Sequence, residues 1–153
     1  MIIQIDTREK ARAITKILAY FDEKQIKHIS SKLYVGDYMN LENPKLIIDR
    51  KQNLLELANN VCQDRKRYVS EIKKACEAEI KLIFLVEHSK NIKTLEDVRK
   101  WINPRLKTSP MAVSGERLYK ILSVLQNTYG VEYRFCQKNE TGKIIAELLR
   151  GGA

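Results

Sequence analysis

Residues 35–51 have the sequence Val-Gly-Asp-Tyr-Met-Asn-Leu-Glu-Asn-Pro-Lys-Leu-Ile-Ile-Asp-Arg-Lys. Two short runs, 38–41 and 45–49, are separated by Glu-Asn-Pro, and an Asn-Pro pair favours a turn. The pattern predicts two adjacent antiparallel strands. This hairpin determines how the rest of the chain is interpreted, because it brings charged residues together at its open end.

Asp37, Asp49 and Lys51 lie at that open end. Asp49 and Lys51 are two residues apart, so on extended backbone their side chains point to the same side of the sheet. Asp37 would face them from the neighbouring strand. Two carboxylates beside one ammonium group can hold a hard divalent cation and activate a water molecule against a phosphodiester. A solvated strand end without a chemical role is the alternative interpretation of the same residues.

Three motifs in matching order resemble the XPF/Mus81/Hef (ERCC4-type) structure-specific endonucleases. Gly36-Asp37-Tyr38 and Asp49-Arg50-Lys51 are similar to the nuclease signature of that family, which is Gly-Asp, a spacer, Glu-Arg-Lys, three residues and Asp. Asp6-Thr7-Arg8-Glu9 is similar to its Asp-x-Arg-Glu motif. An acid followed by Asp/Glu-x-Lys is also typical of the wider restriction-endonuclease-like superfamily.

The resemblance implies a site that depends on Mg²⁺ or Mn²⁺. Asp37 and Asp49 would bind the metal, with the backbone carbonyl of Arg50 nearby, and Lys51 would orient or activate the attacking water. Asp6 and Glu9 would complete the catalytic group. The residues that the resemblance places on DNA are Arg8, Arg50, Arg65 and Arg67.

Two positions differ from the family signature. Asp49 stands where the family has Glu, a replacement found in the wider superfamily. The closing Asp falls on Leu55, which can neither bind a metal nor accept a hydrogen bond. Glu56 comes next, but one step along a helix turns a side chain by about 100°, so we do not expect it to substitute. Leu55 keeps open a second interpretation, a DNA-binding module that has lost cleavage, and a third, a scaffold domain with relic motifs.

Length and composition indicate one globular domain at 1–150, followed by a loose tail at 151–153. Hydrophobic residues make up 44% of the chain and charged residues 31%, which is ordinary for a soluble protein. No apolar run reaches about 18 residues and no signal-peptide pattern is present, so we expect no membrane partner and a cytoplasmic location. We also expect no helix-hairpin-helix tandem, as in compact phage or prokaryotic nuclease modules.

The formal net charge is +9 and the pI is about 9.5. This balance fits a polyanionic partner such as DNA, because each neutralised phosphate releases counterions, although solubility alone is the alternative. The three cysteines, Cys62, Cys76 and Cys136, form no Cys-x-x-Cys pair. A disulfide framework or a zinc site is therefore not expected.

Hydrophobic periodicity predicts the other elements. Strands are expected at 2–6, 27–35, 81–87 and 131–135. Helices are expected at 10–24, 54–61, 64–78, 94–101, 116–128 and 141–149, with a long loop at 103–115. Residues 82–86 are apolar without alternation, which indicates a strand covered on both faces.

This order predicts an α/β fold with three layers, α/β/α, around a central mixed sheet. The resemblance implies the same architecture, of the restriction-endonuclease-like type. It also implies a metal-dependent DNA endonuclease that acts on branched, flap or junction DNA in repair or recombination. Nuclease domains of this family tend to pair, so a homodimer is expected.

Overall fold

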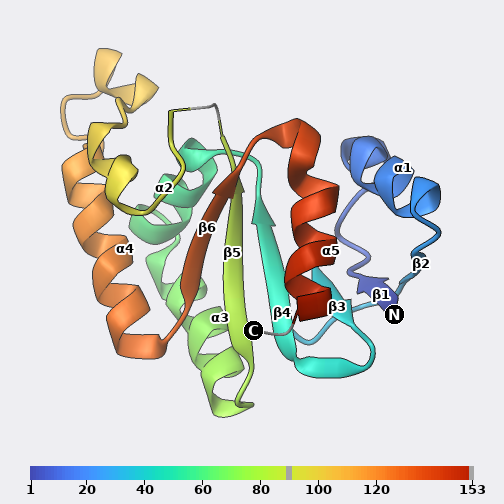
Figure 1. The fold of residues 1–153 in the computed structure, drawn as a ribbon. Coiled ribbons are helices and arrows are strands. Elements are labelled where there is room, and N and C mark those ends of the chain that lie inside the picture. The colour runs from blue at the N-terminus through green and yellow to red at the C-terminus, as the bar shows by residue number, and fades with distance from the viewer. Residues whose placement is uncertain (89–90, 152–153) are drawn as a thin grey trace.

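A mixed β-sheet forms the centre of the molecule (Figure 1). The computed structural model describes residues 1–88 and 91–151, and in these residues six strands pair in the order β2-β1-β3-β4-β5-β6. Their bounds are β1 Ile2–Ile5, β2 Lys27–Ser30, β3 Tyr38–Asn40, β4 Asn43–Lys51, β5 Lys81–Glu87 and β6 Glu132–Cys136. Strand β3 is antiparallel to β1 and β4, whereas β1–β2, β4–β5 and β5–β6 are parallel pairs.

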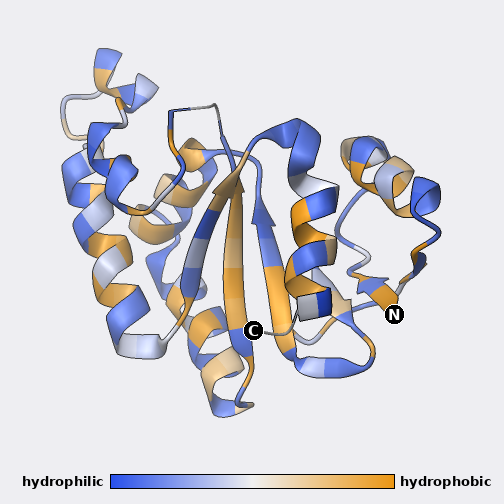
Figure 2. Ribbon diagram, in the orientation of Figure 1, coloured by the Kyte–Doolittle hydropathy of each residue, from blue (hydrophilic) through white to orange (hydrophobic). Residues whose placement is uncertain are grey.

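Helices cover both faces of this sheet. The α-helices are α1 Thr15–Glu23, α2 Leu54–Cys62, α3 Arg65–Glu77, α4 Gly115–Tyr129 and α5 Thr141–Gly151. One apolar core lies between the sheet and α1 with α5, and a second lies between the sheet and α2, α3 and α4. Figure 2 shows the apolar sides of the helices turned toward the strands. The predicted three-layer α/β/α architecture is confirmed.

None of the helices in the described part of the chain is both long and apolar enough to cross a membrane.

The predicted hairpin is present as β3 and β4. Tyr38 pairs with Ile48 and Met39 with Ile47, after which the register shifts so that Asn40 pairs with Asn43. The Asn40 carboxamide oxygen accepts the N–H of Glu42 at 3.0 Å, which closes a turn tighter than predicted. Strand β4 therefore begins at Asn43, and its apolar centre, residues 46–48, is buried on both faces of the sheet.

The expected second strand, 27–35, is shorter in the structure because side chains from the β1 segment, Gln4 and Asp6, bind its backbone. Strand β2 ends at Ser30, and the N–H of Leu33 then donates to the carboxylate of Asp6 at 2.7 Å. The side chain of Gln4 also donates to the carbonyl of Lys32. These bonds to side chains compete with the backbone hydrogen bonds to a neighbouring strand that a longer β2 would need.

Four short 3₁₀ helices are present in the described part of the chain, and the first three lie within expected elements. They are η1 Ala11–Ala13, η2 Glu96–Lys100, η3 Pro104–Lys107 and η4 Lys138–Glu140. The expected helix at 94–101 is present only as η2. The Asp97 carboxylate accepts the N–H groups of Lys93 and Thr94, and the Thr94 hydroxyl accepts the N–H of Asp97, a reciprocal cap at the start of this element. The expected loop at 103–115 contains η3. Gly151, which the sequence assigned to the tail, is the last residue of α5, and the rest of the predicted tail, 152–153, lies outside the described residues.

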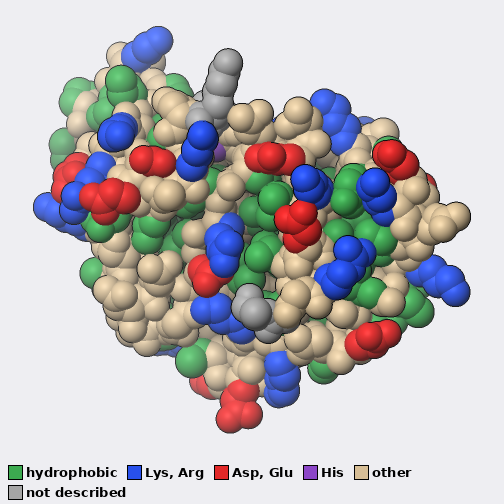
Figure 3. Space-filling view, viewed as in Figure 1, with side chains coloured by type: hydrophobic (Ala, Val, Ile, Leu, Met, Phe, Trp, Pro, Cys, Tyr) green, Lys and Arg blue, Asp and Glu red, His purple; other side chains and the backbone are tan. Residues whose placement is uncertain are grey.

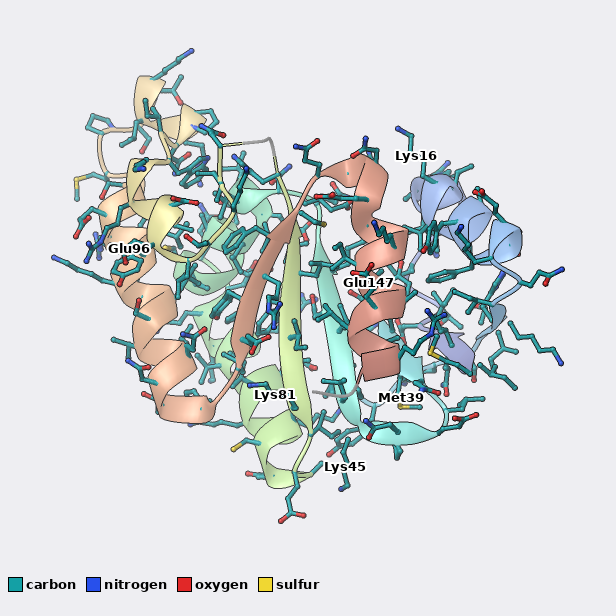
Figure 4. The ribbon with its side chains drawn as sticks, viewed as in Figure 1. Lys16, Met39, Lys45, Lys81, Glu96 and Glu147 are labelled. Carbon is teal, nitrogen blue, oxygen red and sulfur yellow. The ribbon has the colours of Figure 1, made fainter. Side chains whose placement is uncertain are left out.

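The two ends of the central strands differ in chemistry. At the end where β4 and β5 begin, Lys45 and Lys81 extend beyond the sheet (Figure 4). Lys45 donates to the carbonyl of Ala78 at the end of α3, and Lys81 donates to the carbonyl of Gly130 at the end of α4. Cations at helix C-termini neutralise unsatisfied carbonyls. The acidic residues lie at the opposite end, where parallel strands of α/β proteins usually carry their sites.

Gly36 is the residue whose backbone shapes the entry to β3. Its φ is +68°, and a Cβ there would lie 2.5 Å from Ile47 Cγ2 and 3.2 Å from the Ile48 carbonyl oxygen. Gly130 has a similar φ of +72°, but no atom lies within 4 Å of the position of its Cβ. The two glycines therefore separate backbone strain from steric overlap.

Gly36→Ala should lower the free energy of unfolding by about 2–5 kcal/mol. About 1–2 kcal/mol comes from the left-handed backbone and about 1–3 kcal/mol from overpacking against Ile47. Gly130→Ala is the control. Its free energy of unfolding should fall only by the backbone contribution of about 1–2 kcal/mol. Urea denaturation of both variants measures the difference, and equal losses would show that Gly36 makes no critical close contact.

Candidate active site

The backbone around Asp37 is fixed by both neighbouring strands. The Asp37 N–H donates to the carbonyl of Ile48 at 2.8 Å, and the Asp37 carbonyl accepts the N–H of Asp6 at 2.8 Å. The N–H of Arg50 then donates to Asp37 Oδ2 at 2.7 Å. The hairpin register thus holds the Asp37 carboxylate directly beside the segment Asp49-Arg50-Lys51, as the sequence predicted.

Asp49 and Lys51 point to the same side of β4. Lys51 Nζ lies 3.1 Å from Asp49 Oδ1, and it also lies 5.8 Å from the ring centroids of Tyr68 and Phe84. Stacked rings beneath an ammonium group hold it in place without removing its charge. The expectation from strand alternation is confirmed for this pair.

Burial raises the pKa values of both carboxyl groups. For Asp37 the pKa lies well above its ordinary range because of burial first, and then because of the negative charges of Asp49 and Glu9. For Asp49 burial also raises the pKa, although Lys51 opposes this effect. Carboxylates that repel each other in a buried site favour an added cation. This is an electrostatic property that suits a divalent metal.

The donor set limits how such a metal would be held. In residues 1–88 and 91–151, no group of three or more His, Cys, Asp or Glu side chains is arranged to hold a metal ion. Asp37 and Asp49 would therefore have to share a cation with water, a backbone carbonyl and a substrate phosphate. Mg²⁺ is commonly bound in this way, by one or two carboxylates with several retained waters. The residues present fit that mode of binding.

The carboxylates open into a pocket of about 310 Å³ between the hairpin, α2 and α3. Polar side chains dominate its wall. The residues that line it are Arg8, Glu9, Val35, Gly36, Asp37, Asp49, Arg50, Lys51, Glu56, Asn60, Asp64, Arg67, Tyr68, Glu71, Leu82 and Phe84.

Arg50 turns its guanidinium to the other side of β4, into a buried network. Its side chain is 6% exposed and pairs with Glu9 at 2.7 Å and with Glu87. Tyr38 donates to Glu9 at 2.7 Å, and Thr141 donates to Glu87 at 2.7 Å. The network joins the ends of β1, β4 and β5 to the start of α5. The predicted contact of the Arg50 side chain with DNA stays a prediction, and in this conformation the guanidinium is occupied by carboxylates.

Asp6 and Glu9, both predicted as catalytic, have separate positions. Asp6 is fully buried, does not line the pocket, and binds the N–H of Leu33 and the guanidinium of Arg8. Glu9 lines the pocket but uses its carboxylate on Arg50 and Tyr38. Asp6 therefore orients Arg8, whose side chain is 63% exposed and lines the pocket.

The structure distinguishes the two arginines proposed near the scissile phosphate. Arg67 lines the pocket, whereas Arg65 lies on the outer side of α3 beside Lys66, Lys73 and Lys74. On the face of the molecule seen in Figure 3, basic and acidic side chains are interspersed. Net charge therefore does not identify a DNA-binding surface on that face, and candidate phosphate contacts are better assigned from the pocket.

Sequence reasoning missed two participants. Glu87, the last residue of β5, received no role from the sequence, but it is a buried partner of Arg50. Glu56 was not expected in the site, yet it lines the pocket, while Leu55 does not. The signal for Glu56 was its spacing from Asn53, whose side chain accepts the N–H of Glu56 at 2.8 Å and so sets the start of α2.

A family model described as the ERCC4 domain matches residues 5–148 of the chain. Two solved structures of XPF from Aeropyrum pernix, one of them a complex with DNA, are each 20% identical to it. Their superpositions cover 99% of this chain with TM-scores of 0.70 and 0.69, and this chain spans 65% and 64% of theirs. The chain thus has the same fold as these XPF structures, the restriction-endonuclease-like fold. No curated protein matches the chain.

Asp37→Asn should stabilise the metal-free protein near neutral pH. The folded-state pKa of Asp37 is raised, so the wild type loses stability as pH rises from the unfolded pKa of about 4 through the folded pKa. The variant has no ionisable group at position 37, so it does not lose this stability. Each pKa unit between the folded and unfolded states corresponds to about 1.4 kcal/mol in the free energy of unfolding. Urea unfolding in EDTA should show the difference at pH 7.5 and little difference near pH 4.

Asp97→Asn is the control of opposite sign. The pKa of Asp97 is lowered by hydrogen bonds from the N–H groups of Lys93 and Thr94, so its amide should weaken the protein at pH 7.5. If Asp37→Asn also weakened the protein, the folded state would stabilise the Asp37 anion and the electrostatic account of the site would be wrong.

Proposed function

The chain belongs to the ERCC4 domain family, and on that basis we propose that it is a metal-dependent endonuclease that hydrolyses phosphodiester bonds in branched or flap DNA. The observation that carries the proposal is the pairing of Asp37 and Asp49 beside Lys51 in one polar pocket. Two neighbouring carboxylates whose mutual repulsion a cation would relieve, with an ammonium group 3.1 Å from one of them, suit such hydrolysis.

Each residue would contribute a separate part of the chemistry. Asp37 and Asp49 would hold Mg²⁺ or Mn²⁺, with the Arg50 carbonyl nearby. The metal would polarise the phosphate and lower the pKa of a bound water. Lys51, positioned by Asp49 and by the rings of Tyr68 and Phe84, would orient the attacking water and offset charge that develops on phosphorus.

Arg8 and Arg67 would bind phosphates at the rim of the pocket. Both line it, and neither is enclosed by the protein. Arg8 is held by Asp6 through its Nε at 2.6 Å, so it can present its remaining N–H groups to an anion. Arg67 comes from the opposite wall, on α3. Together they would clamp the DNA backbone across the site.

A second candidate function is DNA binding without cleavage. The observation that favours it is Leu55, which stands where the family signature has its closing acid and lies outside the pocket lining. Such a module would bind branched DNA through the same arginines. The two candidates differ in a single measurable property, metal-dependent cutting.

The remaining expectations also belong to this proposal. We propose a single nuclease domain at 1–150 that acts in the cytoplasm during DNA repair or recombination. The tendency of family nuclease domains to pair supports a homodimer. XPF from Aeropyrum pernix has been solved with DNA, which supports DNA as the partner of this chain.

The wild type should cut labelled flap, fork or junction DNA in Mg²⁺ or Mn²⁺, and EDTA should abolish cutting. Asp49→Asn should lower the rate by more than about 100-fold, because an amide is a much weaker ligand for a hard cation. Gel-based cleavage and mobility-shift assays on the same substrates measure both properties. If Asp49→Asn cut DNA at the wild-type rate, the proposed metal site would be wrong. If the wild type bound DNA without cutting it, the second candidate function would be favoured.

Arg67→Ala should lower the cleavage rate more than DNA affinity, and it should reduce the salt slope of binding by about one unit. Arg65→Ala, on the same helix but outside the pocket, removes the same charge and should leave the cleavage rate of bound DNA unchanged. Single-turnover rates and salt titrations compare the two variants. Equal effects on cleavage would mean that Arg67 acts only through general charge.

A further inference from the structure

One wall of the pocket is formed by α2, and it presents oxygen atoms that the proposed chemistry does not yet use. Glu56 and Asn60 are four residues apart, so they lie on the same side of the helix, and both line the pocket. Leu55, one residue earlier, does not line it. The wall is therefore polar even though the signature position is occupied by leucine.

Asn60 carries an unusual atom. Its Oδ1 is the one buried side-chain nitrogen or oxygen atom, within residues 1–88 and 91–151, that has no hydrogen-bond partner. Burying an acceptor without a hydrogen-bond partner costs the desolvation free energy of that group, and no new hydrogen bond offsets this cost. Asn60 itself lines the candidate active site, so a turn of its carboxamide would bring Oδ1 to a group bound there that supplies the missing donor.

Glu56 is held in position by the start of its helix. The Asn53 side chain accepts the Glu56 N–H at 2.8 Å, which fixes the first turn of α2. The carboxyl group is close enough to Lys51 and Asp49 for their charges to act on it. It therefore shares the pocket with the two proposed metal ligands, but these three acids do not form a side-chain metal cluster.

A cation bound between Asp37 and Asp49 would need hydrogen-bond acceptors for its water molecules. A cation held by only two carboxylates keeps much of its water shell. Those water molecules donate hydrogen bonds and need acceptors that face the pocket. Groups that hold such water from outside the metal commonly decide both its orientation and the affinity of the metal.

We infer that Glu56 and Asn60 accept hydrogen bonds from the water shell of the divalent cation held by Asp37 and Asp49. Both are positioning residues, since they act through water and not by contact with the metal. The inference rests on the proposed function and extends it: the acid absent at Leu55 is replaced by an acceptor pair on α2. Asn60 has no counterpart in the motifs that revealed the site.

The test measures metal binding without DNA. Calorimetric titration of the full chain with Mn²⁺, and separately with Mg²⁺, should give a wild-type dissociation constant that Asp37→Asn raises strongly. Glu56→Gln and Asn60→Leu should each raise it by about 10-fold or more. Asn60→Asp, which keeps an acceptor oxygen, should bind at least as tightly as the wild type. Glu77→Gln removes the same charge from the outer side of α3 and should change nothing.

Thermal unfolding of the metal-free variants provides a second measurement. Asn60→Leu removes the unpaired acceptor, so it should unfold at the wild-type temperature or higher while losing metal affinity. Wild-type affinity in both Glu56→Gln and Asn60→Leu would overturn the inference and leave the proposed function intact. If instead the wild type bound neither cation, the proposed metal dependence itself would fail, and the inference with it.

Discussion

The buried guanidinium of Arg50 is the interaction on which the arrangement of the site depends. A charge removed from water must be paired and fully hydrogen-bonded, or the fold loses several kcal/mol. Arg50 meets this requirement with Glu9 and Glu87, which come from the segments after β1 and at the end of β5. Because its own N–H binds Asp37, the residue that joins the strand ends also holds a carboxylate in the pocket. Asp49 and Lys51 then face that pocket by simple alternation along β4.

The local part of this design could be predicted from sequence. The Asn-Pro turn and the two apolar runs identified the hairpin, and a spacing of two residues placed Asp49 and Lys51 on one side. The continuous apolar run in β5 identified a strand covered on both faces. These predictions succeed because periods of two and 3.6 residues are properties of the backbone itself. Even so, Asp6 accepts the N–H of Leu33, which lies 27 residues away, and this contact shortened a strand that periodicity had extended.

The remainder depends on contacts between residues far apart in the chain. No local pattern pairs Arg50 with Glu87 or Glu87 with Thr141, since only the packed sheet brings these groups together. Arg65 and Arg67 are equivalent by composition, and they differ because α3 presents opposite sides to the pocket and to solvent. Glu56 was considered and set aside for a similar reason. The start of α2 at Leu54 was predicted, but no local pattern shows which side of that helix faces the pocket.

The hydrogen bond between Glu87 and Thr141 also has a consequence for synthesis of the chain on the ribosome. Domains are made from the N-terminus at about 5–20 residues per second, so Asp37, Asp49 and Lys51 emerge early. Thr141 follows Glu87 by 54 positions and belongs to α5, which covers one face of the sheet. Until α5 has emerged and docked, Glu87 lacks the hydrogen bond from Thr141, and its remaining partner in the network is Arg50. A nascent chain would therefore carry the acidic residues without the completed scaffold, which delays assembly of the site until α5 has emerged from the ribosome.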